Sequence, residues 1–353
     1  MSIYMDNAAT TPLSPSVIVD ICRNIDNYGN PSGLYQLGYD AKNIIEDARR
    51  KVAKAINAEP EQIFFTSGAT ESNNWVANMY DNIIANKYEH HSITMQPNFI
   101  DKETIIDIDE KYPMSIISNM LINNEVGFIN NIKNFSKKYQ SIGFKTHSDL
   151  TQAIGNVTVD VKELNIDYCS FSAHKFHCLK GVGVLYVKDP TSSDFKPYHY
   201  GGQQEFNLRA GTENVIGISA MGVAIEEAVE NIDKKQEHCK CLRNEFISYL
   251  KKNDINFIVN GENLPHIDSI LSLSFKDRDN SSMLIQLDEK GIACSSGSAC
   301  NSGNSEPSET LKYLNVPKEY INGTLRFSFS LENTIDEVDY VCYNISRIIK
   351  GGN

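Results

Sequence analysis

The chain has 353 residues, 41% of them hydrophobic, so it is long enough to bury a full-sized core with one large and one smaller domain. Its formal net charge of −12 would repel nucleic acid and anionic membrane surfaces, and no long basic run offsets that charge locally. The first residues lack the pattern of a signal peptide, and no apolar run approaches the ~20 residues that cross a bilayer. We therefore expect a cytoplasmic protein whose eight cysteines are free thiols, without membrane or nucleic-acid partners.

Short apolar runs, several of them followed by helical patterns, predict an α/β fold. The first run, residues 62–65 ("QIFF"), stops at "TSGATES" and passes into a stretch whose apolar residues recur at helical spacing. We expect further strands at residues 114–121, 143–147, 166–171 and 183–187. Strands that alternate with helices in this way build one mostly parallel sheet covered on both faces.

The sequence changes character after a long helical pattern at residues 214–252, which is apolar at first and then charged. Beyond it, "DSILSLSF", "IACSS" and "TLRFSFS" predict strands, and "SSMLIQLDEKG" and "TIDEVDYVCYNISRIIKG" predict helices. Thr334 and Glu337 can form a capping box at the start of the last helix. We therefore expect a large domain at residues 14–251 and a smaller α+β domain made of residues 1–13 and 252–353.

Two motifs lie where predicted strands end, and both suit a ligand. Gly68, Ala69 and Thr70 form a strand-to-helix turn, where unpaired backbone N–H groups and the helix dipole favour a phosphate. Asp149 and Gln152, in "HSDLTQ", follow another strand at the edge where α/β sheets collect their ligands. Taken alone, the first motif is more often an ordinary capped turn, and the second is equally consistent with a helix N-cap.

A lysine and a cysteine complete the candidate residues. In "SFSAHKFHCLKG", Lys175 comes just after a predicted strand and can become a low-pKa amine suited to Schiff-base chemistry, although it can also be a surface lysine. Cys300 lies in the polar stretch "GIACSSGSACNSGNSEPSE", which cannot bury a thiol, so we expect this cysteine to be presented to a reaction partner. The "HCKC" of residues 238–241 is a lone cluster in a charged helical pattern and indicates a solvated helix face, not a metal site.

A phosphate turn, an acid, a lysine and an exposed thiol are together the parts of a pyridoxal phosphate enzyme. The chain resembles the cysteine desulfurases of the nitrogen-fixation and iron-sulfur-cluster type, which are class V members of the fold type I pyridoxal phosphate enzymes. The motifs that carry the resemblance follow in family order over nearly the whole chain: "YMDNAATTP", "GNPSGLYQLG", "FFTSGATES", "EHHS", "NNEVG", "HSDLTQ", "SFSAHKF", "LRAGTEN", "SSGSACNS" and "TLRFSFS". The resemblance implies a homodimer with a large, mostly parallel-sheet domain and a smaller α+β C-terminal domain.

The same resemblance implies which residues hold pyridoxal 5'-phosphate. Lys175 would form the Schiff base and later shuttle protons at the substrate Cα, and Asp149 would pair with the pyridinium nitrogen. Gln152 would hydrogen-bond the phenolic oxygen of the ring, and His90 would stack on the ring and assist proton transfer. The remaining cofactor contacts would come from the turn residues Ala69 and Thr70, from Ser172 and His174, from Asn124 beside the ring, and from Thr212 of the partner subunit.

For the substrate, the resemblance implies a cysteine whose sulfur is removed. Arg326 would clamp the substrate carboxylate, a bidentate task that suits a guanidinium, and Asn30 would assist it. Cys300 would attack the sulfur, leaving L-alanine and an enzyme persulfide that is passed to a sulfur-acceptor protein for iron-sulfur clusters or for thiolated tRNA and cofactors. The sequence does not name that acceptor.

Three features depart from the resemblance. Cys178 and Leu179 stand where many family members have Gly-Pro, the segment between His90 and Asn123 is short, and the chain ends without a longer C-terminal tail. Cys294 lies in the strand-like "GIACSS" and is expected to be half-buried and without a role. The alternatives are selenocysteine lyase or another class V reaction such as an aminotransferase, and a noncatalytic protein that keeps the fold as a platform.

Overall fold

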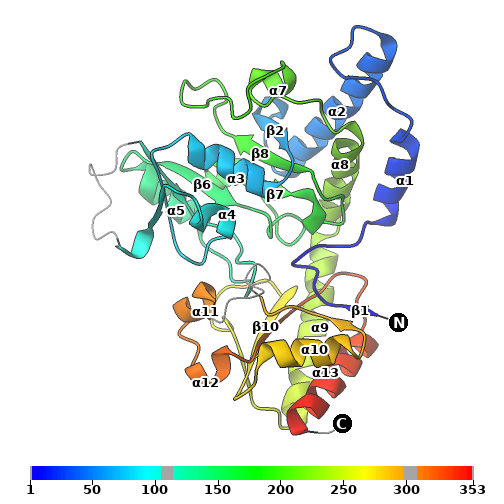
Figure 1. The fold of residues 1–353 in the computed structure, drawn as a ribbon, viewed down its shortest axis with the longest axis vertical. Helices are drawn as coiled ribbons and strands as arrows, with labels where there is room; N and C mark the ends of the chain where they lie inside the picture. Colours follow the sequence, from blue (N-terminus) through cyan, green and yellow to red (C-terminus); the bar gives the residue numbers. More distant parts are fainter. Residues whose placement is uncertain (1, 105–113, 298–307, 352–353) are drawn as a thin grey trace. The chain divides into compact units, whose positions relative to one another are not determined.

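The computed structural model describes residues 2–104, 114–297 and 308–351. The chain divides into two compact units, and Figure 1 shows the ribbon coloured along the sequence, with many of its helices and strands labelled. The sheet unit consists of Thr11–Leu121 and Asn130–Asn231, and the terminal unit consists of Met1–Thr10, Ile122–Ile129 and Ile232–Asn353. The domain boundaries expected from the sequence stay a prediction.

The described residues of the sheet unit form a seven-stranded sheet in the order β2-β8-β7-β6-β5-β3-β4. The strands are β2 (Ile63–Thr66), β3 (Asn82–Ala85), β4 (Phe99–Asp101), β5 (Ser115–Ser118), β6 (Lys145–Asp149), β7 (Tyr168–Ser172) and β8 (Gly183–Val187). The pairs from β4 through β3, β5 and β6 to β7 are parallel, whereas β8 is antiparallel to both β7 and β2. The predicted mostly parallel sheet is therefore confirmed, with β8 reversed.

The helical segments of the sheet unit are α1 (Pro15–Asn24), α2 (Gln36–Ala55), η1 (Pro60–Gln62), α3 (Ala69–Asn78), α4 (His91–Thr94), η2 (Lys102–Thr104), α5 (Ile132–Gln140), α6 (Val161–Leu164), η3 (Ala173–Lys175), α7 (Gln204–Asn207) and α8 (Val215–Glu230). Two apolar clusters show that helices cover both faces of the sheet. Trp75 of α3 packs in one cluster with Ile83, and Phe135 of α5 packs in another with Ile84. Because successive strand residues point to opposite faces, α3 and α5 lie on opposite sides of the sheet.

The terminal unit has its own core around an antiparallel sheet in the order β12-β10-β9. Its elements are β1 (Ile3–Tyr4), α9 (Ile232–Lys252), β9 (Phe257–Val259), β10 (Ile270–Phe275), α10 (Asn280–Asp288), β11 (Ile292–Ala293), α11 (Glu309–Tyr313), α12 (Lys318–Ile321), β12 (Thr324–Ser328) and α13 (Ile335–Lys350). Phe246 of α9 and Val341 of α13 pack with Phe275 and Phe327 of the sheet in this core. The short strands β1 and β11 pair in parallel.

The break within the predicted helical pattern and the start of the last helix show how local hydrogen bonds set helix bounds. The helical pattern expected at residues 214–252 is confirmed as two helices, α8 and α9, with a break at Asn231, whose N–H and side-chain amide both donate to the Glu227 carbonyl, at 3.2 and 2.8 Å. The predicted capping box is confirmed, because Thr334 Oγ1 accepts from the Glu337 N–H at 3.2 Å and Glu337 Oε2 accepts from the Thr334 N–H at 3.0 Å.

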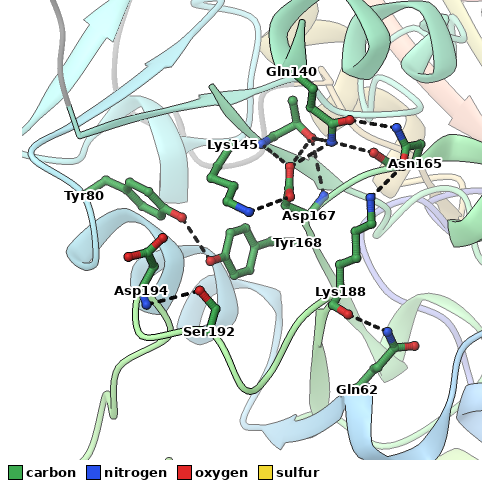
Figure 2. Close-up of polar contacts among 11 residues, drawn as sticks. Gln62, Tyr80, Gln140, Lys145, Asn165, Asp167, Tyr168, Lys188, Ser192 and Asp194 are labelled. Atoms are coloured by element: carbon green, nitrogen blue, oxygen red, sulfur yellow. Dashed lines mark hydrogen bonds and ion pairs between the residues drawn. The ribbon is translucent and has the colours of Figure 1, made fainter. Parts of the chain in front are cut away.

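Figure 2 shows a polar cluster at the edge of the sheet where β6 and β7 begin. One carboxylate oxygen of Asp167 accepts from the Thr146 N–H and from Gln140 Nε2, both at 2.9 Å, and the other accepts from Lys145 Nζ at 3.2 Å. Both oxygens of this buried carboxylate are paired with donors of the protein. We therefore interpret the cluster as stabilising the start of β6 and β7, and not as a binding site.

Candidate active site

The opposite edge of the sheet, where the parallel strands β6 and β7 end, carries the acid and the lysine predicted from the sequence. Asp149 is the last residue of β6 and pairs in register with Ser170 of β7. β7 ends at Ser172, and η3 follows it directly and ends at Lys175. We call residues 173–177 the lysine loop. Adjacent parallel strands deliver their carboxyl ends to one edge, so the fold brings the acid and the lysine to the same side of the sheet.

The turn between β2 and α3 approaches the end of β7 closely. The Ala69 N–H donates to Ser172 Oγ at 2.7 Å, and Thr70 beside it is exposed. Gly68 has a φ of 154°, and a Cβ built on Gly183 would lie 2.4 Å from the Gly68 Cα. A side chain at Gly183 would therefore push the turn away from β8. The glycines let the start of α3, a site that favours anions, lie beside Ser172.

Asp149 is the centre of a hydrogen-bond network. It is 6% exposed, and its two carboxylate oxygens accept from the Thr151 N–H and from Asn73 Nδ2, each at 2.9 Å. Asn73 Nδ2 also donates to Ser92 Oγ at 2.8 Å, and Ser92 Oγ lies 2.7 Å from His90 Nδ1. The network connects the acid to the predicted ring-stacking histidine through two residues that the sequence analysis missed, Asn73 and Ser92.

Both missed residues adjoin motifs that were recognised. Asn73 directly follows "TSGATES", and Ser92 is the last residue of "EHHS". Their polar side chains are buried in the fold, Asn73 completely and Ser92 at 9% exposure. Burial of a polar residue next to a motif marks such positions in the structure. A short helix pattern does not reveal which of its polar residues are buried, so the sequence alone offers no signal for Asn73 or Ser92.

Burial shifts the protonation of the histidines beside the lysine. The pKa of His90 is lowered by burial, with a smaller opposing effect of Asp149 and a further lowering by Lys175. Burial, with the charges of Lys175 and Lys180, also lowers the pKa of His174 to about 4. Both imidazoles are therefore neutral at neutral pH.

The pKa of the Glu89 carboxyl group, next to His90 in the chain, is raised and not lowered. Burial raises the pKa of Glu89 to about 8, against the Met120 N–H that donates to its Oε1. Its Oε2 is buried and has no hydrogen-bond partner among the residues that the structure describes. Glu89 is therefore largely a neutral carboxylic acid at pH 7.

The lysine loop is tied to the first residues of the sheet unit. The N–H and Oγ1 of Thr11 donate to the His174 carbonyl at 3.0 and 2.9 Å, and Thr11 Oγ1 accepts from the His177 N–H at 2.7 Å. The Ser14 N–H donates to the His177 carbonyl at 3.1 Å, and Ser14 Oγ donates to Glu227 of α8 at 2.7 Å. Residues 11–14 therefore form a strap that fixes the backbone around Lys175.

The predicted carboxylate clamp, Arg326, lies on β12 of the terminal unit and is 2% exposed. Its Nη1 donates to the Asn124 carbonyl at 2.7 Å, and its Nη2 donates to Asp6 Oδ1 at 2.7 Å. Its Nε is buried and has no hydrogen-bond partner in the described ranges. The protein therefore holds both terminal nitrogens of the guanidinium, while the buried Nε–H is a donor still to be satisfied.

The structure places the other predicted residues as follows. Gln152 is buried just after β6, whereas Asn30 and Thr212 are exposed, the first before α2 and the second between α7 and α8. The Asn30 side chain accepts from the Ser32 N–H at 3.0 Å. Cys300 lies outside the described residues. The contacts expected for Asn30, Thr212 and Cys300 stay predictions.

The seven described cysteines are free thiols. Burial raises the pKa of Cys178 to about 12, and burial also raises the pKa of Cys294 to about 12. Such thiols contain almost no thiolate at neutral pH and are poor nucleophiles. In "HCKC", Cys241 is exposed as expected, but Cys239 is fully buried in the terminal core, so the prediction of a solvated face is wrong for that residue.

Within the described ranges, no group of three histidine, cysteine or acidic residues could hold a metal ion. No helix among these residues is both long enough and apolar enough to span a bilayer.

The chain is similar to known proteins along almost its whole length. The family model described as Aminotransferase class-V matches residues 3–113 and 108–341. A protein named cysteine desulfurase IscS, from Dictyoglomus turgidum, is 37% identical, and the match covers 99% of this chain and 94% of that protein.

Solved structures are similar as well. A NifS-like protein has 31% identity and a TM-score of 0.89, and the match covers 99% of this chain and 100% of that one. A structure described as SspA in complex with cysteine has 25% identity and a TM-score of 0.78, with 94% and 100% covered.

Proposed function

Because this chain belongs to the class V aminotransferase family, and within it to the cysteine desulfurases, we propose that it removes sulfur from L-cysteine and releases L-alanine. The observation that carries the proposal is the placement of Asp149 and Lys175 at the adjacent ends of β6 and β7 in a chain 37% identical to a cysteine desulfurase. The cysteine bound in a structure of the same fold supports the choice of substrate.

Members of this family depend on pyridoxal phosphate, and the described residues fit that cofactor. Asn73 Oδ1 and Thr151 Oγ1, both in residues bonded to Asp149, are buried without a hydrogen-bond partner in the part of the chain that the structure describes. A buried carboxylate that receives only neutral donors suits a pyridinium N–H. The glycine turn at the start of α3 suits the phosphate.

Four residues of the sheet unit would act around the cofactor ring. When bound, pyridoxal phosphate supplies an electron sink for negative charge at the substrate Cα. Asp149 would keep the ring nitrogen protonated, and Gln152 would donate to the phenolic oxygen of the ring. Lys175 would bind the cofactor covalently through Nζ and carry protons to and from the substrate Cα. His90 would stack on the ring and assist proton transfer.

The phosphate would be held by neutral donors beside the lysine loop. The Ala69 and Thr70 turn and Ser172 lie together at the start of α3, and His174 is neutral because of its low pKa. Thr212 of the partner subunit would complete this site in a homodimer. Thr212 itself is exposed, which leaves it accessible to a second copy of the chain.

The substrate contacts expected from the sequence would come from Arg326 and Asn30. Arg326 would bind the carboxylate with its unpaired Nε–H, and Asn30 would assist it. Asn124, whose carbonyl holds Arg326, would lie beside the ring.

Cys300 would take the sulfur. Its thiolate would attack the substrate sulfur, so that an S–S bond forms while the Cβ–S bond breaks. The electron pair of the broken bond stays with the carbon fragment, which takes up a proton and leaves as alanine. The persulfide on Cys300 would then pass to an acceptor protein in the cytoplasm, for iron-sulfur clusters or thiolated tRNA and cofactors.

The test is a product balance. Purified protein supplied with pyridoxal phosphate, L-cysteine and a thiol reductant should release alanine and sulfide in equal amounts. Alanine without sulfide, or transfer of the amino group to a keto acid, would overturn the proposal. The same assay with L-selenocysteine separates the desulfurase from a selenocysteine lyase, because a selective lyase would leave L-cysteine unreacted.

A further inference from the structure

The hydrogen bonds around His90 fix which of its ring nitrogens carries the proton. His90 is the residue before α4, and its Nδ1 lies 3.1 Å from the Ser92 backbone N–H. A backbone N–H can only donate. Nδ1 must therefore be an acceptor without a proton of its own, and in a neutral imidazole the proton then resides on Nε2.

The Ser92 side chain reinforces this assignment. Asn73 Nδ2 donates to Ser92 Oγ at 2.8 Å, and the Ser92 hydroxyl lies 2.7 Å from His90 Nδ1. With its oxygen already accepting from the amide, the hydroxyl can direct its own hydrogen to Nδ1. Two donors, the N–H and the O–H of one residue, then point at the same lone pair.

The orientation of Asn73 is itself determined by Asp149. The amide Nδ2 lies 2.9 Å from an oxygen of the Asp149 carboxylate, which can only accept when ionised. A flipped amide would place Oδ1 against that oxygen, where two acceptors repel each other. Asp149 therefore sets Asn73, Asn73 sets the Ser92 hydroxyl, and Ser92 sets the histidine.

We propose that Asn73 and Ser92 are positioning residues that hold the His90 imidazole neutral with its proton on Nε2, so that His90 meets the reacting groups as a hydrogen-bond donor and not as a base. The inference rests on the proposed function, because the Nε2–H of His90 has a catalytic role only if a reaction takes place at this site. Uptake of a proton by Nδ1 would place its hydrogen against the Ser92 backbone N–H, so the bonds to Ser92 disfavour His90 as a base and leave its Nε2–H to assist proton transfer as a hydrogen-bond donor.

The charges that face His90 do not override this arrangement. Asp149 favours the protonated ring, whereas burial, Lys175 and His91 favour the neutral ring, and the net effect is a lowered pKa. A hydrogen bond donated by Ser92 to the neutral imidazole lowers the pKa of His90 further. Removing that donor should therefore raise the pKa of His90.

The proposal is tested by nuclear magnetic resonance of the holoenzyme labelled with 15N-histidine. His90→Gln identifies the His90 signals among the eight histidines. We expect the pattern of a neutral ring protonated at Nε2 at pH 7.5, with a titration midpoint below the ordinary value of about 6.5. In Ser92→Ala the midpoint should rise by about half to one pH unit, since one net hydrogen bond to the neutral ring is lost.

Asn73→Ala should shift the midpoint in the same direction by a smaller amount, because the Ser92 hydroxyl loses its orientation but not its position. Asn78→Ala is the matched control. Asn78 lies on the same helix, is exposed, and donates to the Asn74 carbonyl at 2.7 Å. It should leave the His90 midpoint unchanged.

Kinetics on the same samples add a second measurement. Ser92→Ala should lower kcat for alanine release by about two- to tenfold at unchanged KM and unchanged cofactor absorbance. A His90 signal protonated at Nδ1 or at both nitrogens at pH 7.5 would overturn the proposal, and so would a Ser92→Ala midpoint equal to that of Asn78→Ala. Failure of the parental enzyme to form alanine would refute the proposed function instead, while the Nε2 proton would still be observed.

Discussion

One buried ion pair in the sheet unit holds a strained turn, and we predict a large loss of stability when its cation is removed. Arg49 of α2 donates through Nη1 and Nη2 to the two carboxylate oxygens of Glu205, at 2.9 and 2.7 Å, and both side chains are 3% exposed. Glu205 Oε2 also accepts from the Phe65 N–H at 2.8 Å. Glu205 and Phe206 have φ values of 42° and 58°, which are uncommon for residues other than glycine.

The size of the effect follows from the burial of the pair. In Arg49→Met the Glu205 carboxylate stays buried without its cation, and such a loss costs about 3–5 kcal/mol. Replacing both Arg49 and Glu205 by methionine removes both charges, which is often nearly neutral for a buried pair. The Phe65 N–H then lacks an acceptor, at about 1–3 kcal/mol. The double variant should therefore be more stable than the Arg49→Met variant.

The assay is equilibrium unfolding in urea of the cofactor-loaded protein, followed by circular dichroism. Arg50→Met is the matched control, because Arg50 is the next residue of α2. Its side chain is 61% exposed and forms an ion pair with Asp47 at the surface. The control should change the free energy of unfolding by no more than about 1 kcal/mol. Equal losses in Arg49→Met and Arg50→Met would refute the reasoning, and so would a double variant less stable than the Arg49→Met variant.

Three further predictions concern the chemistry. Lys175→Ala should lose covalent attachment of the cofactor and reduce turnover by about 100-fold or more, and borohydride that still fixed the cofactor to this variant would show that another lysine binds it. Asp149→Asn should retain cofactor yet lose most turnover, because a neutral amide cannot keep the ring nitrogen protonated; near-normal turnover of the loaded variant would contradict this role. Cys300→Ser should bind cofactor but form no persulfide, whereas Cys178→Ser and Cys294→Ser should keep it, as mass spectrometry after one turnover can check; an added sulfur on Cys178 or Cys294 would count against the mechanism.

The edge of the sheet that carries the site could be predicted from the sequence because strand ends are local signals. The run at residues 183–187 coincides with β8, and Asp149 and Lys175 were found because each lies at or just beyond the end of an apolar run. The reversed direction of β8 was not predicted. The connection between Ser172 and Gly183 is too short for the helical crossover that a parallel neighbour requires. The length of this connection was therefore the one sequence feature that indicated the reversed direction of β8.

The network around Asp149 could not be predicted in the same way. Asn73 and Asp149 are 76 positions apart, and their contact depends on how α3 packs against β6. Residues 69–78 give no polar pattern that distinguishes the buried Asn73 from the exposed Asn78, because both are asparagines on one helix. Contacts of this kind are decided by tertiary packing and not by local sequence.

The strap at residues 11–14 has a consequence for the order in which the protein can mature on the ribosome. Thr11 is bonded to a residue 163 positions later, and Ser14 is bonded to Glu227, 213 positions later. At about 5–20 residues per second, the strap waits roughly 8 to 40 seconds for its partners to be synthesised. A nascent chain shorter than 227 residues therefore cannot complete the bonds that fix the backbone around Lys175. Cofactor capture should be a late event in biosynthesis, after α8 has left the ribosome.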